Sequence, residues 1–190
     1  MARIVYVNGR YLPYAQAGVH VEDRGFQFAD SVYEVCEVQG GMLVDATRHL
    51  QRLARSLSEL KIAAPMGERA LRHVLMETIR RNRVRDGLVY VQVSRGQGPR
   101  DFPFPGEATE PTLVVVARPL DQAKIKARAD KGIAVRSVPD MRWGRCDLKT
   151  VMLLPAVLAK EAARIEGAQE AWLVDAAGKV TEGASSNAWI

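Results

Sequence analysis

Lys149 is the residue of this sequence whose surroundings most clearly suggest chemistry. It follows Asp147 and precedes Val151, Leu153 and Leu154, so a basic side chain stands at the start of an apolar segment. Burial disfavours an ammonium ion and lowers the pKa of a lysine toward neutrality. A neutral, desolvated amine is a nucleophile that condenses with an aldehyde to a Schiff base. An exposed helix lysine is the alternative interpretation, and Lys149 taken alone does not decide between the two.

The segment VTEGASSN places a carboxylate beside small hydrogen-bonding residues. Glu182 is followed by Gly183, and Ser185 and Ser186 come shortly after. Small residues let the backbone approach a ligand closely. A carboxylate at such a place can serve as the partner of a protonated pyridine nitrogen. A surface turn of ordinary composition is the alternative.

Two further segments carry groups that bind carboxylates. In SRGQGPRDF, Gly96 and Gly98 shape a loop that presents Arg95 and Arg100. A planar guanidinium binds a carboxylate in bidentate fashion. In EDRGFQFADSVYEV, Tyr33 leads a strand from which its hydroxyl could reach the same group. Solvated loop arginines and a half-buried tyrosine with its hydroxyl in water are the alternatives.

Composition and charge argue against several classes of protein. The 190 residues carry a formal charge of +5, but the arginines are dispersed and aromatic residues are few, so we expect no nucleic-acid partner. No apolar run approaches the ~20 residues of a membrane span, and the N-terminus lacks the pattern of a secretory signal. The 2 cysteines and 3 histidines form no ligand spacing. We therefore expect no metal site and a cytoplasmic protein.

Short strands and helices must position these residues. Asn8-Gly9 and Gly40-Gly41, each between alternating apolar residues, predict two β-hairpins. Residues 87–96 and 111–119 are rich in β-branched residues and predict buried strands joined by a Gly/Pro-rich loop. Strands are also predicted at 132–138 and on either side of a turn at 176–178.

Helical periodicity predicts three helices. A leucine face over residues 50–60, with Thr47 as N-cap, predicts the first, and an apolar face over 71–79 predicts the second. A third is expected from about Asp147 to Glu166, where Pro155 implies a kink or a later start. Separate hairpins and helix pairs predict an α+β fold in two parts, divided near the polar segment 121–132.

Five segments, in this order, resemble one family. EDRGFQFADSVYEV, RHLQRL, SRGQGPRDF, RWGRCDLKTVMLLPAVLAKEAA and VTEGASSN are similar to segments of the D-amino-acid aminotransferases, which are fold-type IV pyridoxal 5′-phosphate enzymes. The resemblance implies a two-domain architecture, with residues 1–120 as a small N-terminal α/β domain. Residues 121–190 would begin the larger cofactor-binding domain. The chain stops at Ile190 directly after the apolar NAWI, and we expect that the C-terminal remainder is missing here.

The resemblance also implies a role for each cofactor-binding candidate. Lys149 matches the Schiff-base lysine, and Glu182 matches the carboxylate bonded to the pyridine nitrogen. Arg52, in RHLQRL, matches the arginine that binds the cofactor phosphate. Ser185 and Ser186 fall in the turn that lines the cofactor and its phosphate.

Tyr33 and Arg100 match two members of the trap for the substrate α-carboxylate, the arginine arriving from the neighbouring subunit of a homodimer. The third member of the best-known pattern is a histidine, and Phe102 stands there in this chain. The activity implied is transamination of D-amino acids such as D-alanine with a 2-oxo acid such as 2-oxoglutarate. An (R)-selective amine transaminase, favoured by Phe102, an aminodeoxychorismate lyase, and an inactive binding or scaffold domain are the alternatives.

Overall fold

The computed structural model describes residues 3–106 and 108–189, and these fold as two compact units. The first unit takes in the described residues up to Asp121 together with Leu148–Val151. The second takes in Gln122–Asp147 and the described residues from Met152 onward. Each unit mixes helices and strands, as the α+β prediction requires. Ile190, at which the expected second domain stops, lies outside the described residues.

Within the described residues, the first unit is built on a six-stranded antiparallel sheet in the order β2-β1-β6-β5-β3-β4. A short helix, α1 (Arg24–Phe28), precedes β3. The strands are β1 (Ile4–Val7), β2 (Arg10–Pro13), β3 (Ser31–Gln39), β4 (Met42–Leu43), β5 (Gly87–Ser94) and β6 (Thr112–Pro119).

Both predicted hairpin turns have the backbone conformation that their sequences favour. Asn8 and Gly9, between β1 and β2, have φ values of +42° and +87°. Gly40 and Gly41, between β3 and β4, have φ values of +56° and +84°. Positive φ at both central positions is the condition for a type I′ turn, which matches the twist of the flanking strands. The two hairpin predictions are confirmed.

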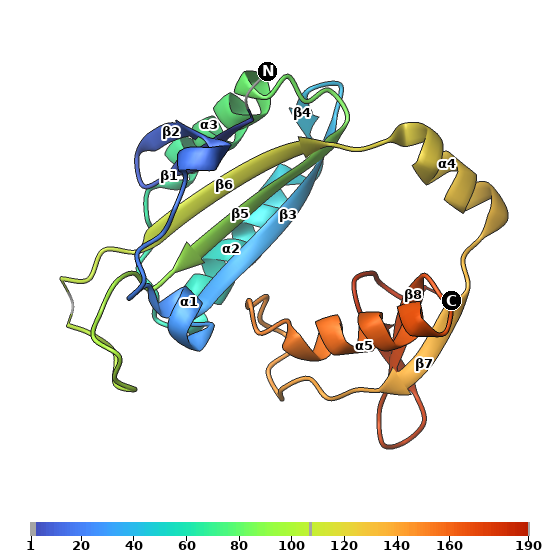
Figure 1. Cartoon of the computed structure of the whole chain (residues 1–190). Helices are drawn as coiled ribbons and strands as arrows, with labels where there is room; N and C mark the ends of the chain where they lie inside the picture. Colours follow the sequence, from blue (N-terminus) through green and yellow to red (C-terminus); the bar gives the residue numbers. More distant parts are fainter. Residues whose placement is uncertain (1–2, 107, 190) are drawn as a thin grey trace. The chain divides into compact units, whose positions relative to one another are not determined.

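Two helices, α2 (Ala46–Glu59) and α3 (Glu68–Arg81), cover one face of this sheet (Figure 1). Their buried leucines, such as Leu53 and Leu75, join strand residues such as Val32 and Val91 in one hydrophobic cluster. Because side chains of a strand alternate between its faces, this core fixes which residues of β3 point away from the helices. Tyr33 is one of those residues.

Helix α2 begins at Ala46, one residue before its expected N-cap. Thr47 was the predicted N-cap, but the helix starts at Ala46 and Asp45 precedes it. Asp45 has a φ of +50°, a left-handed conformation that aspartate tolerates better than most residues. This residue turns the chain sharply from β4 into the helix, so Thr47 already lies in the first helical turn.

As far as the chain is described, the second unit holds a three-stranded sheet in the order β7-β8-β9. Strands β7 and β8 are parallel, and β8 and β9 are antiparallel. Small residues of α5 and β8, including Ala163 and Ala171, form its buried core. The elements are α4 (Gln122–Lys131), β7 (Val135–Pro139), α5 (Leu154–Ile165), β8 (Glu170–Val174) and β9 (Val180–Gly183).

The helix expected from about Asp147 has the later start that Pro155 implied as one alternative. It begins at Leu154, with Pro155 in its first turn, where the missing N–H of proline leaves no helical hydrogen bond unmade. The preceding segment Leu148–Val151 is instead non-helical and pairs with β3. No described helix combines the length and the apolar character needed to cross a bilayer.

Candidate active site

Lys149 is held beside Tyr33 by backbone pairing with β3. The Tyr33 N–H donates to the Lys149 carbonyl at 3.0 Å, and the Val151 N–H donates to the Ser31 carbonyl at 3.1 Å. On either side of Lys149, Leu148 and Thr150 are buried. The half-buried Lys149 side chain therefore points the other way, and its Nζ lies 4.5 Å from the centre of the Tyr33 ring.

Tyr33 belongs to an aromatic pair on the face of the sheet opposite the helices. Its ring centre lies 5.6 Å from that of Tyr90 on β5, and the Tyr90 hydroxyl donates to Gln92 Oε1 at 2.7 Å. Burial, with a smaller contribution from Tyr33, raises the pKa of Tyr90 to about 12. Tyr90 thus packs beside Tyr33 as a neutral phenol.

Arg52 lies on α2, on the helix-covered side of β3, where it contacts Glu34. Its Nε and Nη2 donate to the two carboxylate oxygens, the second at 2.8 Å, and His49 Nδ1 contacts the same carboxylate at 2.8 Å. Glu34 is fully buried, whereas the Arg52 side chain is 46% exposed. Hydrogen bonding to Glu34 raises the pKa of Arg52 above its already high ordinary value. The arrangement is a fixed, permanently charged guanidinium that an anion can reach.

Arg100 and Phe102 lie on the loop between β5 and β6. Arg100 is exposed, with its guanidinium carbon 5.7 Å from the centre of the Phe28 ring. Phe102 is 81% exposed, and its ring centre lies 5.8 Å from that of Phe28. The loop thus presents a cation and an apolar ring side by side, both resting on α1.

Glu182, on β9 of the second unit, is ion-paired with Arg142. Arg142 also contacts Asp140 through Nε at 3.0 Å and Nη2 at 2.8 Å. Its hydrogen bonds hold the pKa of Asp140 well below the usual range, and the bond to Asp140 raises the pKa of Arg142. Arg142 therefore links two carboxylates and fixes the orientation of the Glu182 side chain.

Ser185 and Ser186 share one buried acceptor, Glu170. Their hydroxyls donate to Glu170 Oε2 at 2.7 Å and 3.1 Å, and Lys160 Nζ lies 2.9 Å from the same oxygen. Burial raises the pKa of Glu170, but the bonds from Ser185 and Lys160 outweigh it and leave that pKa below its ordinary value. The two exposed serines are thus oriented by a buried carboxylate.

The turn that carries these serines depends on Gly183. A Cβ at this position would lie 2.4 Å from the Ser186 hydroxyl oxygen and 2.6 Å from the Ser186 carbonyl oxygen. Those separations are far inside van der Waals contact. The absence of a side chain at Gly183 therefore makes the tight turn possible.

The predicted residues divide between the units. Lys149 and Tyr33 lie together in the first unit, which also holds Arg52 on α2 and Arg100 on its loop, each with partners of its own. Glu182 lies in the second unit on β9, with the two serines in the turn that follows.

Three acidic or basic partners were missed by sequence reasoning: Glu34, Arg142 and Glu170. Glu34 did carry a signal, because it is a charged residue on the otherwise apolar face of Val32, Cys36 and Val38. A charge at such a position is buried only if it is paired. Arg142 had no comparable signal, since it lies among other charged residues, and Glu170, between Gln169 and Ala171, was not singled out.

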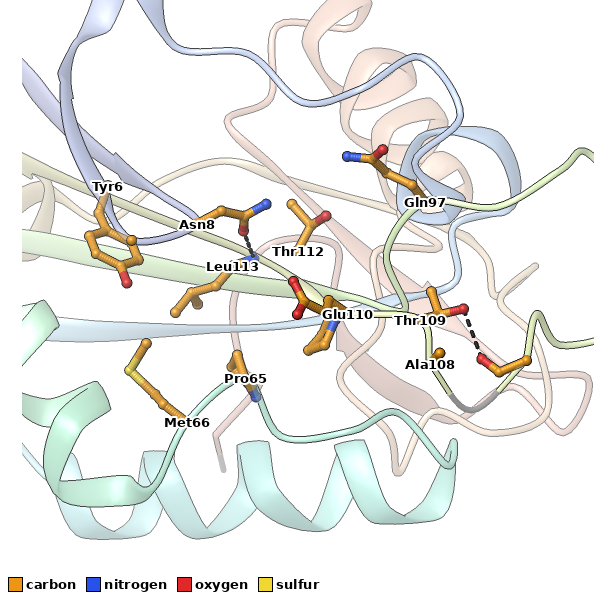
Figure 2. Close-up of a pocket in the computed structure, with 13 residues that line it drawn as sticks. Tyr6, Asn8, Pro65, Met66, Gln97, Ala108, Thr109, Glu110, Thr112 and Leu113 are labelled. Carbon is orange, nitrogen blue, oxygen red and sulfur yellow. Dashed lines mark hydrogen bonds between the residues drawn. The ribbon is translucent and has the colours of Figure 1, made fainter.

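The first unit also has a cleft of about 850 Å³, which is lined by residues other than the predicted site residues (Figure 2). Asn8, Met66, Glu110 and Thr112 are among the residues that line it, and the Leu113 N–H donates to Asn8 Oδ1 across its wall at 2.7 Å. None of the described lining residues is a predicted site residue. The cleft is therefore not the site of the expected chemistry, although it is large.

The chemistry of the predicted set suits a phosphorylated pyridine aldehyde. An amine, a guanidinium, a carboxylate and two hydroxyls are the respective partners of an aldehyde, a phosphate, a ring nitrogen and further phosphate oxygens. The tight turn at Gly183, where a Cβ would overlap Ser186, brings the serine hydroxyls to the end of β9. Among the described residues, no group of three or more His, Cys, Asp or Glu is arranged to hold a metal ion.

Comparison with known proteins gives consistent matches. Residues 31–190 match the family described as Amino-transferase class IV. D-alanine aminotransferases of Bacillus licheniformis and Staphylococcus haemolyticus are 37% and 36% identical, over 98% and 97% of this chain. The chain spans 64% of the length of each of these relatives.

Solved structures of aminotransferases share the fold. The branched-chain amino acid aminotransferase of Escherichia coli superposes with a TM-score of 0.82 at 21% identity, covering 97% of this chain and 63% of that one. A hypothetical aminotransferase from Mycobacterium tuberculosis, in its PLP-bound form, has a TM-score of 0.79 at 24% identity, covering 95% and 65%. At these identities the likeness is one of fold.

Proposed function

The chain belongs to the class IV aminotransferases, and we propose that it is a pyridoxal 5′-phosphate-dependent enzyme that transaminates D-amino acids. D-alanine is the proposed donor and 2-oxoglutarate the proposed acceptor. The observation that carries this proposal is the position of Lys149, whose amine stands beside Tyr33 on a segment pinned to β3. The identity of more than a third to the D-alanine aminotransferase of Bacillus licheniformis supports the choice of D-amino acids.

The residues present fit the cofactor, and we assign them as follows. Lys149 would hold its aldehyde carbon, Glu182 its ring nitrogen, and Arg52 its phosphate, with Ser185 and Ser186 lining the phosphate end. The buried partners Glu34 and Glu170 keep the guanidinium and the hydroxyls in place. When bound, the cofactor supplies a carbonyl that condenses with amines and a ring that accepts electrons.

Proton transfer from the substrate Cα is assigned to Lys149. With the cofactor bound, the Lys149 amine would act as the general base that removes the proton from the substrate Cα. Its half-buried position beside Tyr33 suits this role, because it places the amine next to a proposed substrate-binding residue. The Arg142 ion pair keeps the Glu182 carboxylate aimed in one direction, which favours a protonated ring nitrogen as its partner.

Substrate binding is assigned to the first unit. The Tyr33 hydroxyl and the Arg100 guanidinium would bind the α-carboxylate, and we propose that Arg100 enters the site of the neighbouring subunit in a cytoplasmic homodimer. Residues 1–120 would form the small domain, and 121–190 the start of the larger cofactor-binding domain. Amino and 2-oxo acids are the proposed small-molecule partners.

A second candidate activity rests on Phe102. An exposed phenylalanine stands where the best-known pattern has a hydrogen-bond donor. An apolar ring there favours amines that lack a carboxylate, as in an (R)-selective amine transaminase.

A donor panel tests these assignments. With pyridoxal 5′-phosphate and 2-oxoglutarate present, D-alanine is expected to be used faster than L-leucine, (R)-1-phenylethylamine or aminodeoxychorismate. Absorption near ~410 nm that borohydride bleaches is expected from the lysine–aldehyde condensation. Preference for L-leucine would refute the D-specific assignment. A protein that stays colourless after addition of the cofactor would instead support a binding or scaffold domain.

A further inference from the structure

A buried network of charged side chains lies under the loop that carries Arg100. Asp30 accepts from Arg24 Nε at 2.9 Å, and from Arg95 Nε at 2.7 Å and Nη2 at 2.9 Å. The side chains of Arg24 and Arg95 are 4% and 8% exposed. Charges this deeply buried are stable only when they are paired and hydrogen-bonded. The network is therefore a stable part of the fold, and none of its residues has a role in the proposed chemistry.

Arg24 extends from this network to the loop. Its Nη1 donates to the Asp101 carbonyl at 2.7 Å and its Nη2 to the Phe102 carbonyl at 3.3 Å. All three guanidinium nitrogens of Arg24 are thus engaged, one by Asp30 and two by the loop backbone. A planar guanidinium offers these donors in a fixed fork, so the position of the two carbonyls is set by Asp30.

The loop is also fixed on the other side of Arg100. The Arg24 N–H donates to the Gly96 carbonyl at 2.8 Å, and the Gly98 N–H donates to the Glu22 carbonyl at 3.2 Å. Arg100 therefore lies between two anchored stretches of backbone. Its side chain remains exposed while its main chain is held from both ends.

One aromatic ring joins the two arginines. The ring centre of Phe28 lies 4.6 Å from the Arg24 guanidinium carbon and 5.7 Å from that of Arg100. Phe102 packs against the same ring. A cation–π contact attracts a guanidinium to the face of a ring. Phe28 therefore links Arg24 to the side chains of Arg100 and Phe102.

We propose that Arg24 is a positioning residue that sets the placement of Arg100 and Phe102, and thereby the enzyme's affinity for substrates that carry a carboxylate. This rests on the proposed function, in which Arg100 binds that carboxylate. Arg24 itself does not touch substrate in this scheme. Its effect should therefore fall on carboxylate recognition and leave the proton transfer by Lys149 unchanged.

Arg24→Lys is the sharpest variant. Lysine keeps the positive charge beside Asp30 but cannot donate to Asp30 and two carbonyls in one plane. Losing two hydrogen bonds to the loop predicts a rise of about tenfold in KM for D-alanine. We expect kcat to change by less than about threefold. We expect kcat/KM for (R)-1-phenylethylamine, which has no carboxylate, to be unaffected in the half-reaction without 2-oxoglutarate.

Arg81→Lys is the matched control. Arg81 also stacks on an aromatic ring, at 4.2 Å from the centre of Tyr11, and pairs with Glu77 at 2.7 Å. Neither partner belongs to the loop. This variant should leave both donors unchanged. Equal losses with D-alanine and (R)-1-phenylethylamine in Arg24→Lys, or an unchanged KM for D-alanine in a folded protein, would overturn the proposal.

Amide hydrogen exchange gives a readout that is independent of activity. The Gly98 and Asp101 amides are hydrogen-bonded within the anchored loop, to Glu22 and Pro99. Arg24→Lys should speed their exchange relative to the parent protein and to Arg81→Lys. If the parent protein does not use D-alanine, the proposed function fails, and unchanged exchange in Arg24→Lys then separately refutes the anchoring.

Phe28→Leu is a second variant that tests the same proposal if Arg24→Lys does not fold. It removes the ring between the two arginines and leaves the Asp30 ion pairs in place. We expect the preference for D-alanine over (R)-1-phenylethylamine to fall by about threefold or more. An unchanged preference would count against the role of Arg24 and Phe28 in placing the loop.

Discussion

The side-chain nitrogen of Lys149 lies 4.5 Å from the centre of the Tyr33 ring, although the two residues are far apart in the chain. Backbone hydrogen bonds on either side of Lys149 create this relationship. The amine is thereby held over one face of the sheet, beside an aromatic ring. This pair is the structural basis of the proposed activity.

Lys149→Ala should abolish the proposed reaction. Loss of the amine removes both the attachment to the cofactor and the general base, so we expect turnover of D-alanine to fall by about 10³-fold or more. The absorption near ~410 nm should disappear as well. Lys179→Ala, which removes an exposed lysine, should keep both properties. Turnover that survives in Lys149→Ala would refute the assignment.

Gly183→Ala should distort the serine turn. A methyl group there would overlap Ser186, and such overpacking costs about 1–3 kcal/mol of unfolding free energy. We expect lower stability in urea and weaker cofactor binding. Gly144→Ala is the control, because a Cβ at Gly144 meets nothing within 4 Å. If both variants were as stable as the parent protein, the close approach at Gly183 would be unimportant.

Phe102→His should strengthen carboxylate binding. An imidazole N–H at this exposed position adds a donor beside Arg100, and one added hydrogen bond is worth about fivefold in KM for D-alanine. The preference for D-alanine over (R)-1-phenylethylamine should rise accordingly. Phe26→His places the same group on α1, at another exposed phenylalanine, and should leave the preference unchanged. Parallel behaviour of the two variants would argue against a role for residue 102.

Asp30 should make stability depend on acid pH. Burial raises the pKa of Asp30, but hydrogen bonds from Arg95 and Arg24 outweigh it and bring the pKa below its ordinary value of 3.8. The unfolded chain therefore binds this proton first as the pH falls. The stabilisation from Asp30 is fully present above about pH 5 and is lost progressively as the pH falls through the folded-state pKa.

Asp30→Asn tests this dependence by urea unfolding between neutral and acid pH. Two buried arginines lose their anionic partner, so we expect the variant to be less stable at neutral pH by about 3–5 kcal/mol. Its unfolding free energy should then decline less than that of the parent protein on acidification. Asp130→Asn, at an exposed ion pair with Lys126, should follow the parent curve. Parallel curves for Asp30→Asn and the parent would contradict the prediction.

Much of the local structure was predictable from the sequence because it depends on neighbouring residues. Asn8-Gly9 and Gly40-Gly41 favour positive φ, and both form the expected turns. The leucine spacing of α2 and the apolar face of α3 lie against the sheet as their periodicity predicted. The tight turn at Gly183 likewise follows from the small residues around it.

The non-helical conformation of Leu148–Val151 was not predictable in this way. Its apolar residues continue into α5 without a break in pattern, so the pattern predicts a helix from about Asp147 and only Pro155 indicates the later start at Leu154. What decides its conformation is pairing with Ser31 and Tyr33 on β3. Local propensity cannot report a hydrogen bond to a strand that is distant in the chain.

The sequence by itself determined the turns, the periodic faces and the set of amine, guanidinium, carboxylate and hydroxyl groups that identifies the family. Only the tertiary structure decided their partners: Glu34 for Arg52, Arg142 for Glu182, Glu170 for the serines, and Arg24 for the loop of Arg100. The physical reason is that a buried charge is stable only where a complementary group meets it. Whether two such groups come together depends on how distant segments of the chain pack, which the sequence of a single segment does not specify.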